Sequence, residues 1–151
     1  MMTINEWSDA TAMAQAVKNK TVSPRELVEV TIREAERTNP KINAIVSQRY
    51  EKALKEAEAR DFSEKPFAGV PIFLKDLGQE QAGEPSTAGS RLFTSYHATE
   101  TDNYVKKFEE LGFIILGRSS TPEFGFKNIS DAQIHGPVNL PDDVTRSRNS
   151  V

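Results

Sequence analysis

Lys75 is the residue whose position in this sequence most strongly suggests chemistry, because it ends a short apolar run. Ile72, Phe73 and Leu74 precede it, with glycine and proline on one side and Gly78 on the other, which is typical of a buried strand. Burying an ammonium group costs several kcal/mol unless the group is paired or loses its proton. A lysine at this place therefore needs a physical reason to be there.

Two interpretations of Lys75 fit the residues around it. In the structural one, its side chain reaches water at the strand end and pairs with Asp76. In the catalytic one, burial favours the neutral amine, which then acts as a general base. The residue pattern alone leaves both interpretations open.

Other reaction chemistries find little support in the sequence. There is no cysteine, which excludes disulfides, thiol nucleophiles and zinc–thiolate sites and fits a reducing compartment. The two histidines, His97 and His135, have no acid placed by any pattern to orient them, so a Ser-His-Asp triad is weakly supported. No phosphate-binding glycine loop and no metal-ligand spacing is present, so we expect neither a cofactor nor a metal.

Composition narrows the possible partners. A chain of 151 residues is long enough for one domain with a hydrophobic core. The net charge is −3 and no basic block is present, which argues against nucleic acid as a binding partner. There is no signal-peptide pattern and no apolar run long enough to cross a bilayer, which argues against a membrane. We therefore expect a cytoplasmic protein that acts on a small molecule.

The elements that must position Lys75 begin with three helices. Ile4, Trp7, Ala10, Ala14 and Val17 follow helical spacing, with Thr3 and Glu6 as a capping box. A second helix is predicted to start at Ser23-Pro24 and to stop at Asn39, because Pro40 follows. Residues 44–46 form either a short strand or a buried turn, and a third helix carries Tyr50, Ala53, Leu54 and Ala57 on one face.

A second apolar strand is predicted downstream of Lys75. A long irregular stretch reaches about His97, and loops of this length are usually functional or disordered. A helix then carries Tyr104, Val105, Phe108 and Leu111, ends at Gly112 and leads directly into Phe113–Leu116. Strand, helix and strand predict a parallel pair with helices on both faces. Two strands cannot bury their own faces and edges, so the pattern predicts the front part of a larger domain.

The lysine segment and the second strand together resemble the amidase signature family. Residues 69–77, GVPIFLKDL, are similar to the lysine motif of that family, and residues 112–125, GFIILGRSSTPEFG, are similar to its next segment. Residues 136–141, GPVNLP, with Arg146 and Arg148 after them, resemble the approach to its glycine- and serine-rich signature. The resemblance covers nearly the whole chain and is specific for the family, not for a substrate.

The resemblance implies an α/β fold, with a mixed β-sheet and helices on both faces. It implies hydrolysis of a carbon–nitrogen amide bond by a nucleophilic serine, a second serine with a cis peptide bond, and a lysine, which here is Lys75. It also implies that Phe124, Gly125 and Phe126 border a substrate pocket, although packing explains the two phenylalanines equally well.

By the same resemblance, residues 1–151 form the amino-terminal part of one amidase domain that is incomplete at its C-terminus. It divides into a helical lead-in (1–66), the lysine motif and sheet core (67–126) and a lead-in to the absent signature (127–151). Both catalytic serines are expected beyond Val151, so this fragment alone is expected to be inactive. It is also expected to self-associate, because its strand edges lack the sheet neighbours that later sequence of the family supplies. The alternatives are a non-catalytic binding or interaction module and the amidase-like subunit of a transamidating complex.

Overall fold

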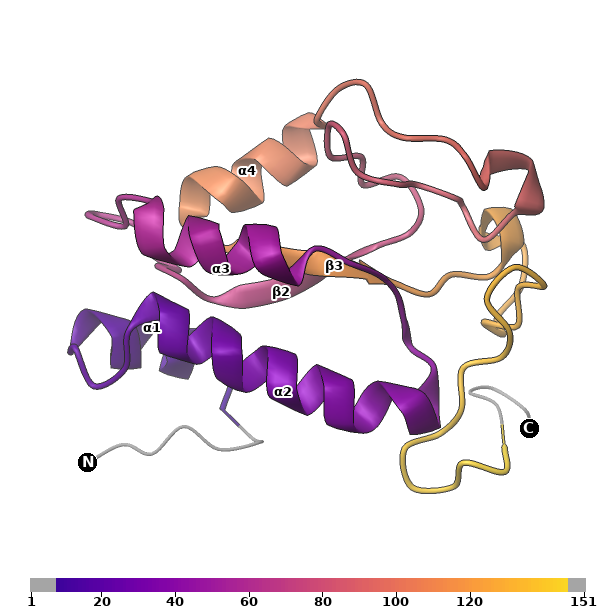
Figure 1. Ribbon diagram of the computed structural model, residues 1–151, viewed down its shortest axis with the longest axis horizontal. Helices are drawn as coiled ribbons and strands as arrows, with labels where there is room; N and C mark the ends of the chain where they lie inside the picture. Colours follow the sequence, from indigo (N-terminus) through magenta and orange to yellow (C-terminus); the bar gives the residue numbers. More distant parts are fainter. Residues whose placement is uncertain (1–7, 147–151) are drawn as a thin grey trace.

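The computed structural model describes residues 8–146, which form one mixed sheet with helices packed around it. Four α-helices and three strands follow one another as α1 (Ala10–Lys18), α2 (Pro24–Ile42), β1 (Ile45–Gln48), α3 (Tyr50–Ala59), β2 (Pro71–Lys75), α4 (Asn103–Leu111) and β3 (Ile114–Ser119). Two short 3-10 turns, η1 (Arg91–Phe93) and η2 (Glu123–Gly125), lie in the loops (Figure 1). The α/β class predicted from the sequence is confirmed.

The sheet of the described chain has the strand order β1-β3-β2, with β3 in the centre. β2 and β3 are parallel, as the strand–helix–strand pattern predicted, and β1 pairs with β3 in the antiparallel sense. β1 makes the sheet mixed and resolves the ambiguity of residues 44–46 in favour of a strand. It also means that the predicted lead-in, residues 1–66, contains a strand as well as helices.

Helices cover both faces of the sheet because side chains of β3 alternate between two apolar clusters. Ile114 and Leu116 pack against α2 and α3, whereas Ile115 packs with Leu74 and with Val105 of α4. These side chains are at most 2% exposed. At roughly 1.5–3 kcal/mol for each large apolar side chain buried, these contacts fix the sheet against its helices.

Helix α2 begins where the sequence predicted and ends later than predicted. Ser23 caps it, accepting from the Glu26 amide, and the Glu26 carboxylate accepts from the Ser23 amide, which completes the capping box. The predicted end at Asn39 is wrong, because the helix continues through Pro40 to Ile42. Asn43 closes it instead in a left-handed conformation, donating its amide to the carbonyl of Asn39.

Helix α1 is shorter than the periodic pattern predicted. It begins at Ala10, and Asp9 caps it by accepting from the Ala12 amide. The predicted capping box of Thr3 and Glu6, together with Ile4 and Trp7, lies outside the described residues. Helix α4 ends at Gly112 as predicted, with φ at +100°, a conformation that favours glycine.

Two ordered segments gather beyond the C-terminal ends of β2 and β3, at the right of Figure 1. Residues 76–102 fold back on themselves through backbone pairs such as Gly83 N–H to Ala98 O (2.8 Å) and Ala98 N–H to Glu84 O (3.0 Å). Residues 120–146 attach to the end of α2, where the Asn43 side-chain amide donates to the carbonyls of His135 and Pro137. These segments bring loop residues to the end of β2, where Lys75 lies.

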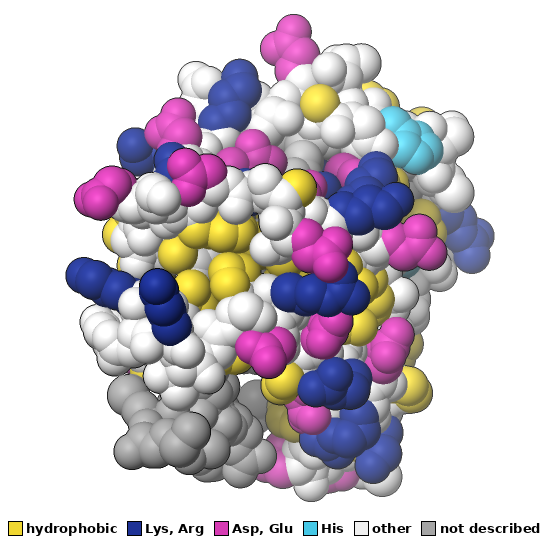
Figure 2. Space-filling model, turned by 60° about the vertical axis from the view of Figure 1, so that its left-hand side comes forward, with side chains coloured by type: hydrophobic (Ala, Val, Ile, Leu, Met, Phe, Trp, Pro, Cys, Tyr) yellow, Lys and Arg dark blue, Asp and Glu magenta, His cyan; other side chains and the backbone are white. Residues whose placement is uncertain are grey.

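The surface seen in Figure 2 mixes charges of both signs around apolar side chains. Ion pairs join neighbouring helices, as Arg25 of α2 does with Glu58 of α3. A face of mixed sign creates no strong field of one sign over it. The division at residues 66 and 126 stays a prediction.

Candidate active site

Lys75 is the last residue of β2, paired in register with Ser119 of β3. Its side chain is exposed, and its ammonium group makes no hydrogen bond or ion pair with any residue between 8 and 146 that the structure describes. Of the two interpretations, the side chain reaches water as the structural one expects, and the burial that the catalytic one requires is not found among residues 8–146. Side chains alternate along β2, so Lys75 lies on the same sheet face as Phe73, whereas Leu74 is buried against α4.

Asp76 does not pair with Lys75, because its carboxylate is 1% exposed and turned into the protein. Its Oδ1 accepts the backbone N–H of Thr87 at 2.9 Å, and its Oδ2 accepts the Thr87 hydroxyl. His135 Nε2 lies 3.6 Å from Oδ2 and 3.1 Å from the Thr87 oxygen. Three segments distant in sequence thus meet at the residue that follows Lys75.

The charge on Asp76 is stabilised in this site. Burial alone would raise the pKa of the carboxyl, but the neighbouring His135 ring, the hydrogen bonds from Thr87 and the positive charge of Arg118 outweigh it, so the pKa lies below its usual value. Burial lowers the pKa of Arg118, and nearby acids, Asp76 first among them, oppose that shift. The site therefore contains a buried carboxylate and a buried guanidinium close to the end of β2.

The backbone of Lys75 is held on both sides although its side chain is free. Arg118 Nη1 donates to the Lys75 carbonyl at 3.1 Å, and the Lys75 amide donates to Gln79 Oε1 at 2.6 Å. The next amide, that of Asp76, donates to the Ser119 carbonyl at 3.0 Å. Arg118 Nε and Nη2 are buried without a partner among the described residues. These bonds fix where the lysine leaves the main chain.

Sequence reasoning missed Thr87, Arg118 and His135 as partners of the lysine segment. His135 was set aside because no sequence pattern places an acid to orient it, yet Asp76, 59 positions earlier, lies beside it in space. Arg118 is an arginine inside a buried strand, and the cost of burying its charge is the signal that could have pointed to a function for it. Thr87 carried no such signal, because turn residues are common in loops.

Phe124, Gly125 and Phe126 form the short turn η2 and its end, and Gly125 lies against Leu77, just beyond the end of β2. Phe124 and Phe126 are 37% and 87% exposed, and their ring centroids lie 5.9 Å apart. The ring centroid of Phe124 also lies 6.1 Å from that of Phe93. Gly125 has φ at +73°, and a Cβ there would come within 2.9 Å of the Leu77 side chain. The three residues form an exposed aromatic surface, and their role in binding substrate stays a prediction.

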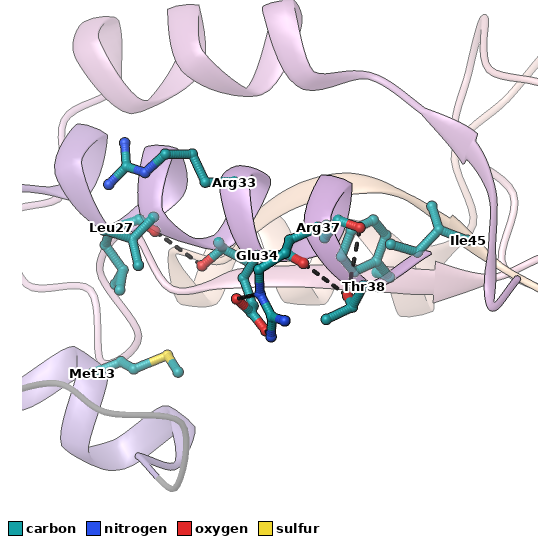
Figure 3. A pocket seen from close by; sticks show the side chains of 11 residues that line it. Met13, Leu27, Arg33, Glu34, Arg37, Thr38 and Ile45 are labelled. Carbon is teal, nitrogen blue, oxygen red and sulfur yellow. Dashed lines mark hydrogen bonds and ion pairs between the residues drawn. The ribbon is translucent and has the colours of Figure 1, made fainter. Parts of the chain in front are cut away.

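A separate hollow of about 690 Å³ lies between α1, α2 and the sheet (Figure 3). Met13 of α1 faces Leu27, Glu34 and Thr38 of α2 across it, and Ile45 and Phe73 line its sheet side. Arg37 and Glu34 of α2 are ion-paired with each other at its rim. The residues that β1 and β2 contribute to the lining of this hollow are apolar, and Lys75 is not among the lining residues.

Two further searches concern only residues 8–146. No group of three or more histidine, aspartate or glutamate side chains in that range could hold a metal ion. None of the helices described there is long and apolar enough to cross a membrane.

Comparison with known proteins decides the family. The family model described as Amidase matches residues 26–148. The chain belongs to the amidase family. This confirms the resemblance on which the interpretation of Lys75 depends.

The amidase relatives include enzymes named as amide hydrolases. A lipoamidase of Enterococcus faecalis is 41% identical over 133 residues, covering 87% of this chain and 18% of that protein. The 6-aminohexanoate-cyclic-dimer hydrolase of Paenarthrobacter ureafaciens is 34% identical over 149 residues, covering 97% of this chain and 30% of that protein. The chain thus spans less than a third of the length of either relative.

Solved amidase structures share its fold. A structure of 6-aminohexanoate cyclic dimer hydrolase superposes with a TM-score of 0.89 at 34% identity, covering 96% of this chain and 30% of that one. A bacterial aryl acylamidase of the amidase signature family gives 0.83 at 31% identity, covering 93% and 31%. The predicted fold, the front portion of the amidase signature fold, is confirmed.

Proposed function

We propose that this chain supplies the lysine of an amide hydrolase that cleaves a carbon–nitrogen bond of a small-molecule substrate. Membership of the amidase family and the place of Lys75, at the end of a parallel strand inside a segment that resembles the lysine motif, carry the proposal. In it the nucleophilic serine and the cis serine belong to sequence that follows Val151, as the resemblance implies.

In the proposed reaction the neutral amine of Lys75 accepts a proton from the bridging cis serine, which in turn accepts the proton of the nucleophilic serine. The serine oxygen bonds to the amide carbon, and the carbon–nitrogen bond breaks as the leaving amine takes up the proton. Water then attacks the acyl-enzyme, giving the acid and restoring the serine. Lys75 therefore acts as base first and as acid second.

Residues 1–151 alone are expected to have no detectable activity. Lysine cannot form the acyl intermediate by itself, and the oxyanion donors of the family come from the same absent region. Removing one oxyanion donor already costs about 10²–10³ in rate. Turnover by this chain alone that depends on Lys75 would mean that the nucleophile lies within it. The first positions to examine would then be Ser86, Ser90, Ser147 and Ser150.

The test is a chimera in which this chain replaces the matching amino-terminal 30% of the 6-aminohexanoate-cyclic-dimer hydrolase. We expect hydrolysis of the cyclic dimer, and a loss of about 10²–10⁴ in kcat on Lys75→Ala, which is the usual size of a general-base effect. Lys75→Arg should be equally inactive because arginine keeps its proton. Lys55→Ala, which changes another exposed lysine on α3, is the matched control and should retain full activity.

One relative favours a second candidate, the amidase-like subunit of a transamidating complex. This relative, one of the subunits of the glutamyl-tRNA(Gln) amidotransferase of Nitratidesulfovibrio vulgaris, is 31% identical over 139 residues, covering 89% of this chain. The two candidates share the acyl-enzyme and its hydrolysis by water, and they differ in the fate of the nitrogen that leaves the amide. A free-standing hydrolase releases the ammonia or amine to solvent, whereas a subunit of a transamidating complex passes ammonia to an acceptor held by another subunit. Turnover of a small amide by the active chimera without any added acceptor or subunit favours the hydrolase. A non-catalytic module would leave every chimera inactive.

A further inference from the structure

We propose that Thr87 and His135 are positioning residues for Lys75. By holding the carboxylate of Asp76, they fix the main chain from which the Lys75 side chain extends. The inference rests on the proposed function, because it concerns how the lysine of that site is held. Neither residue touches Lys75, so both act through the main chain at the end of β2.

The first support is the arrangement of the three side chains. Asp76 is bonded at both oxygens by Thr87, one from the backbone amide and one from the hydroxyl, and His135 closes the group from the other side. Asp76 and Thr87 are 1% and 8% exposed, and the His135 side chain is 15% exposed. Charge-assisted hydrogen bonds in a buried place are stronger than neutral ones in water. The group therefore ties residue 76 to two loops.

The second support is a count of protons. The Thr87 hydroxyl gives its only proton to Asp76, and its oxygen accepts the Gly89 amide at 3.2 Å. The remaining lone pair can bond His135 only if Nε2 carries a proton. An unprotonated Nε2 would also direct its lone pair toward the negative Asp76 carboxylate, 3.6 Å away, which is unfavourable. His135 is thus assigned as a donor from Nε2 to Thr87, which fixes its tautomer.

The third support is the position of the group relative to the lysine. The Lys75 carbonyl and amide are held by Arg118 and Gln79, and the peptide that follows is held through Asp76. The Lys75 side chain itself is exposed and unrestrained by the described residues. The accuracy with which its amine meets a serine hydroxyl therefore depends on the main chain at residues 75 and 76. A displacement of 1 Å can cost about 100-fold in rate.

The kinetic test uses the active chimera with two pairs of variants. Thr87→Val removes the hydroxyl and keeps the shape, and Thr87→Ser restores the hydroxyl. His135→Leu removes the donor, and His135→Gln can return an N–H near the same place. We expect kcat to fall about 10- to 100-fold in the Val and Leu variants, with KM nearly unchanged and substantial recovery in the Ser and Gln variants. Equal kcat in each pair, in folded protein, would overturn the proposal.

A second measurement needs no catalysis and uses the 151-residue chain itself. Nitrogen-15 NMR of the His135 ring should show Nε2 protonated, and the amide proton of Asp76 should exchange with solvent faster in Thr87→Val than in Thr87→Ser. A ring protonated on Nδ1 alone, or equal exchange in the two variants, would refute the arrangement. If Lys75→Ala leaves the chimera active, the proposed function fails, while the NMR result still decides whether Thr87 and His135 hold Asp76.

Discussion

Gly117→Ala offers the sharpest test of how β1 is joined to the central strand. Gly117 lies in β3 opposite Gln48, with φ at +149°. A Cβ built there would stand 2.0 Å from the Ser47 carbonyl oxygen and 2.9 Å from its carbon. Both atoms are backbone, so no side chain can turn away to make room. The substitution must therefore push β1 off β3.

The expected cost combines two effects. Overpacking of a filled site costs about 1–3 kcal/mol, and forcing a non-glycine residue into a glycine-only backbone region costs another 1–3 kcal/mol or so. We expect the free energy of unfolding of Gly117→Ala to fall by roughly 3 kcal/mol or more, measured by urea denaturation of the 151-residue chain. This is a large part of the 5–15 kcal/mol or so that stabilises a typical domain.

The control is Gly83→Ala, which separates the close approach from the backbone conformation. Gly83 also has a positive φ, +79°, but no atom lies within 4 Å of the place its Cβ would take. Only the left-handed conformation is penalised there, by about 1–2 kcal/mol. If Gly117→Ala costs no more than Gly83→Ala, the contact between β1 and β3 is not as tight as described.

Two further predictions concern acid and association. Because the pKa of Asp76 is lower in the folded chain than in the unfolded one, its charge stabilises the fold above about pH 4 and that contribution is lost as pH falls through the folded pKa. Asp76→Asn should therefore destabilise the chain by about 1.5–3 kcal/mol at pH 7, and the difference in unfolding free energy from the wild type should disappear as the pH falls below the folded pKa of Asp76. A difference that stays constant with pH would argue against this role. The chain should also self-associate, since β1 and β2 are the edges of the described sheet and unpaired edges recruit strands; a sedimentation mass that stays monomeric at every concentration would contradict this.

The elements that the sequence predicted well carry their signals in adjacent residues. Continuous apolar runs marked β2 and β3, and the Ser23-Pro24 start and the Gly112 stop have local hydrogen-bond reasons that do not depend on the rest of the fold. The wrong prediction that α2 ends at Asn39 also came from a local rule, namely that a helix stops before a proline. Pro40 lies in the last turn of α2, where its missing amide costs one bond, and Asn139 holds that turn by donating to the carbonyls of Ile42 and Lys41. Local sequence rules do not contain contacts with so distant a segment.

Of the candidate site, the sequence predicted only Lys75. Its other residues come together in the folded structure and follow no pattern along the sequence. Thr87 and His135 stand 48 residues apart and meet at Asp76 only after the loop that follows β2 and the segment that follows β3 have both folded. The pattern of Lys75 and Asp76 suggested an ion pair between neighbours. In the structure Lys75 is the last residue of β2 and its side chain is exposed, whereas Asp76, the first residue after the strand, is buried and bonded to Thr87.

The opposite orientations of Lys75 and Asp76 divide the requirements of a general base between two residues. A base must leave the main chain at a fixed point, and its amine must lose water to become neutral. The first requirement is met within residues 8–146, because Arg118, Gln79 and the buried Asp76 hold the backbone on either side of Lys75. The second is not met there, because the side chain is exposed. If Lys75 is the base, the groups that surround its amine during catalysis are therefore supplied by the substrate or by residues other than 8–146.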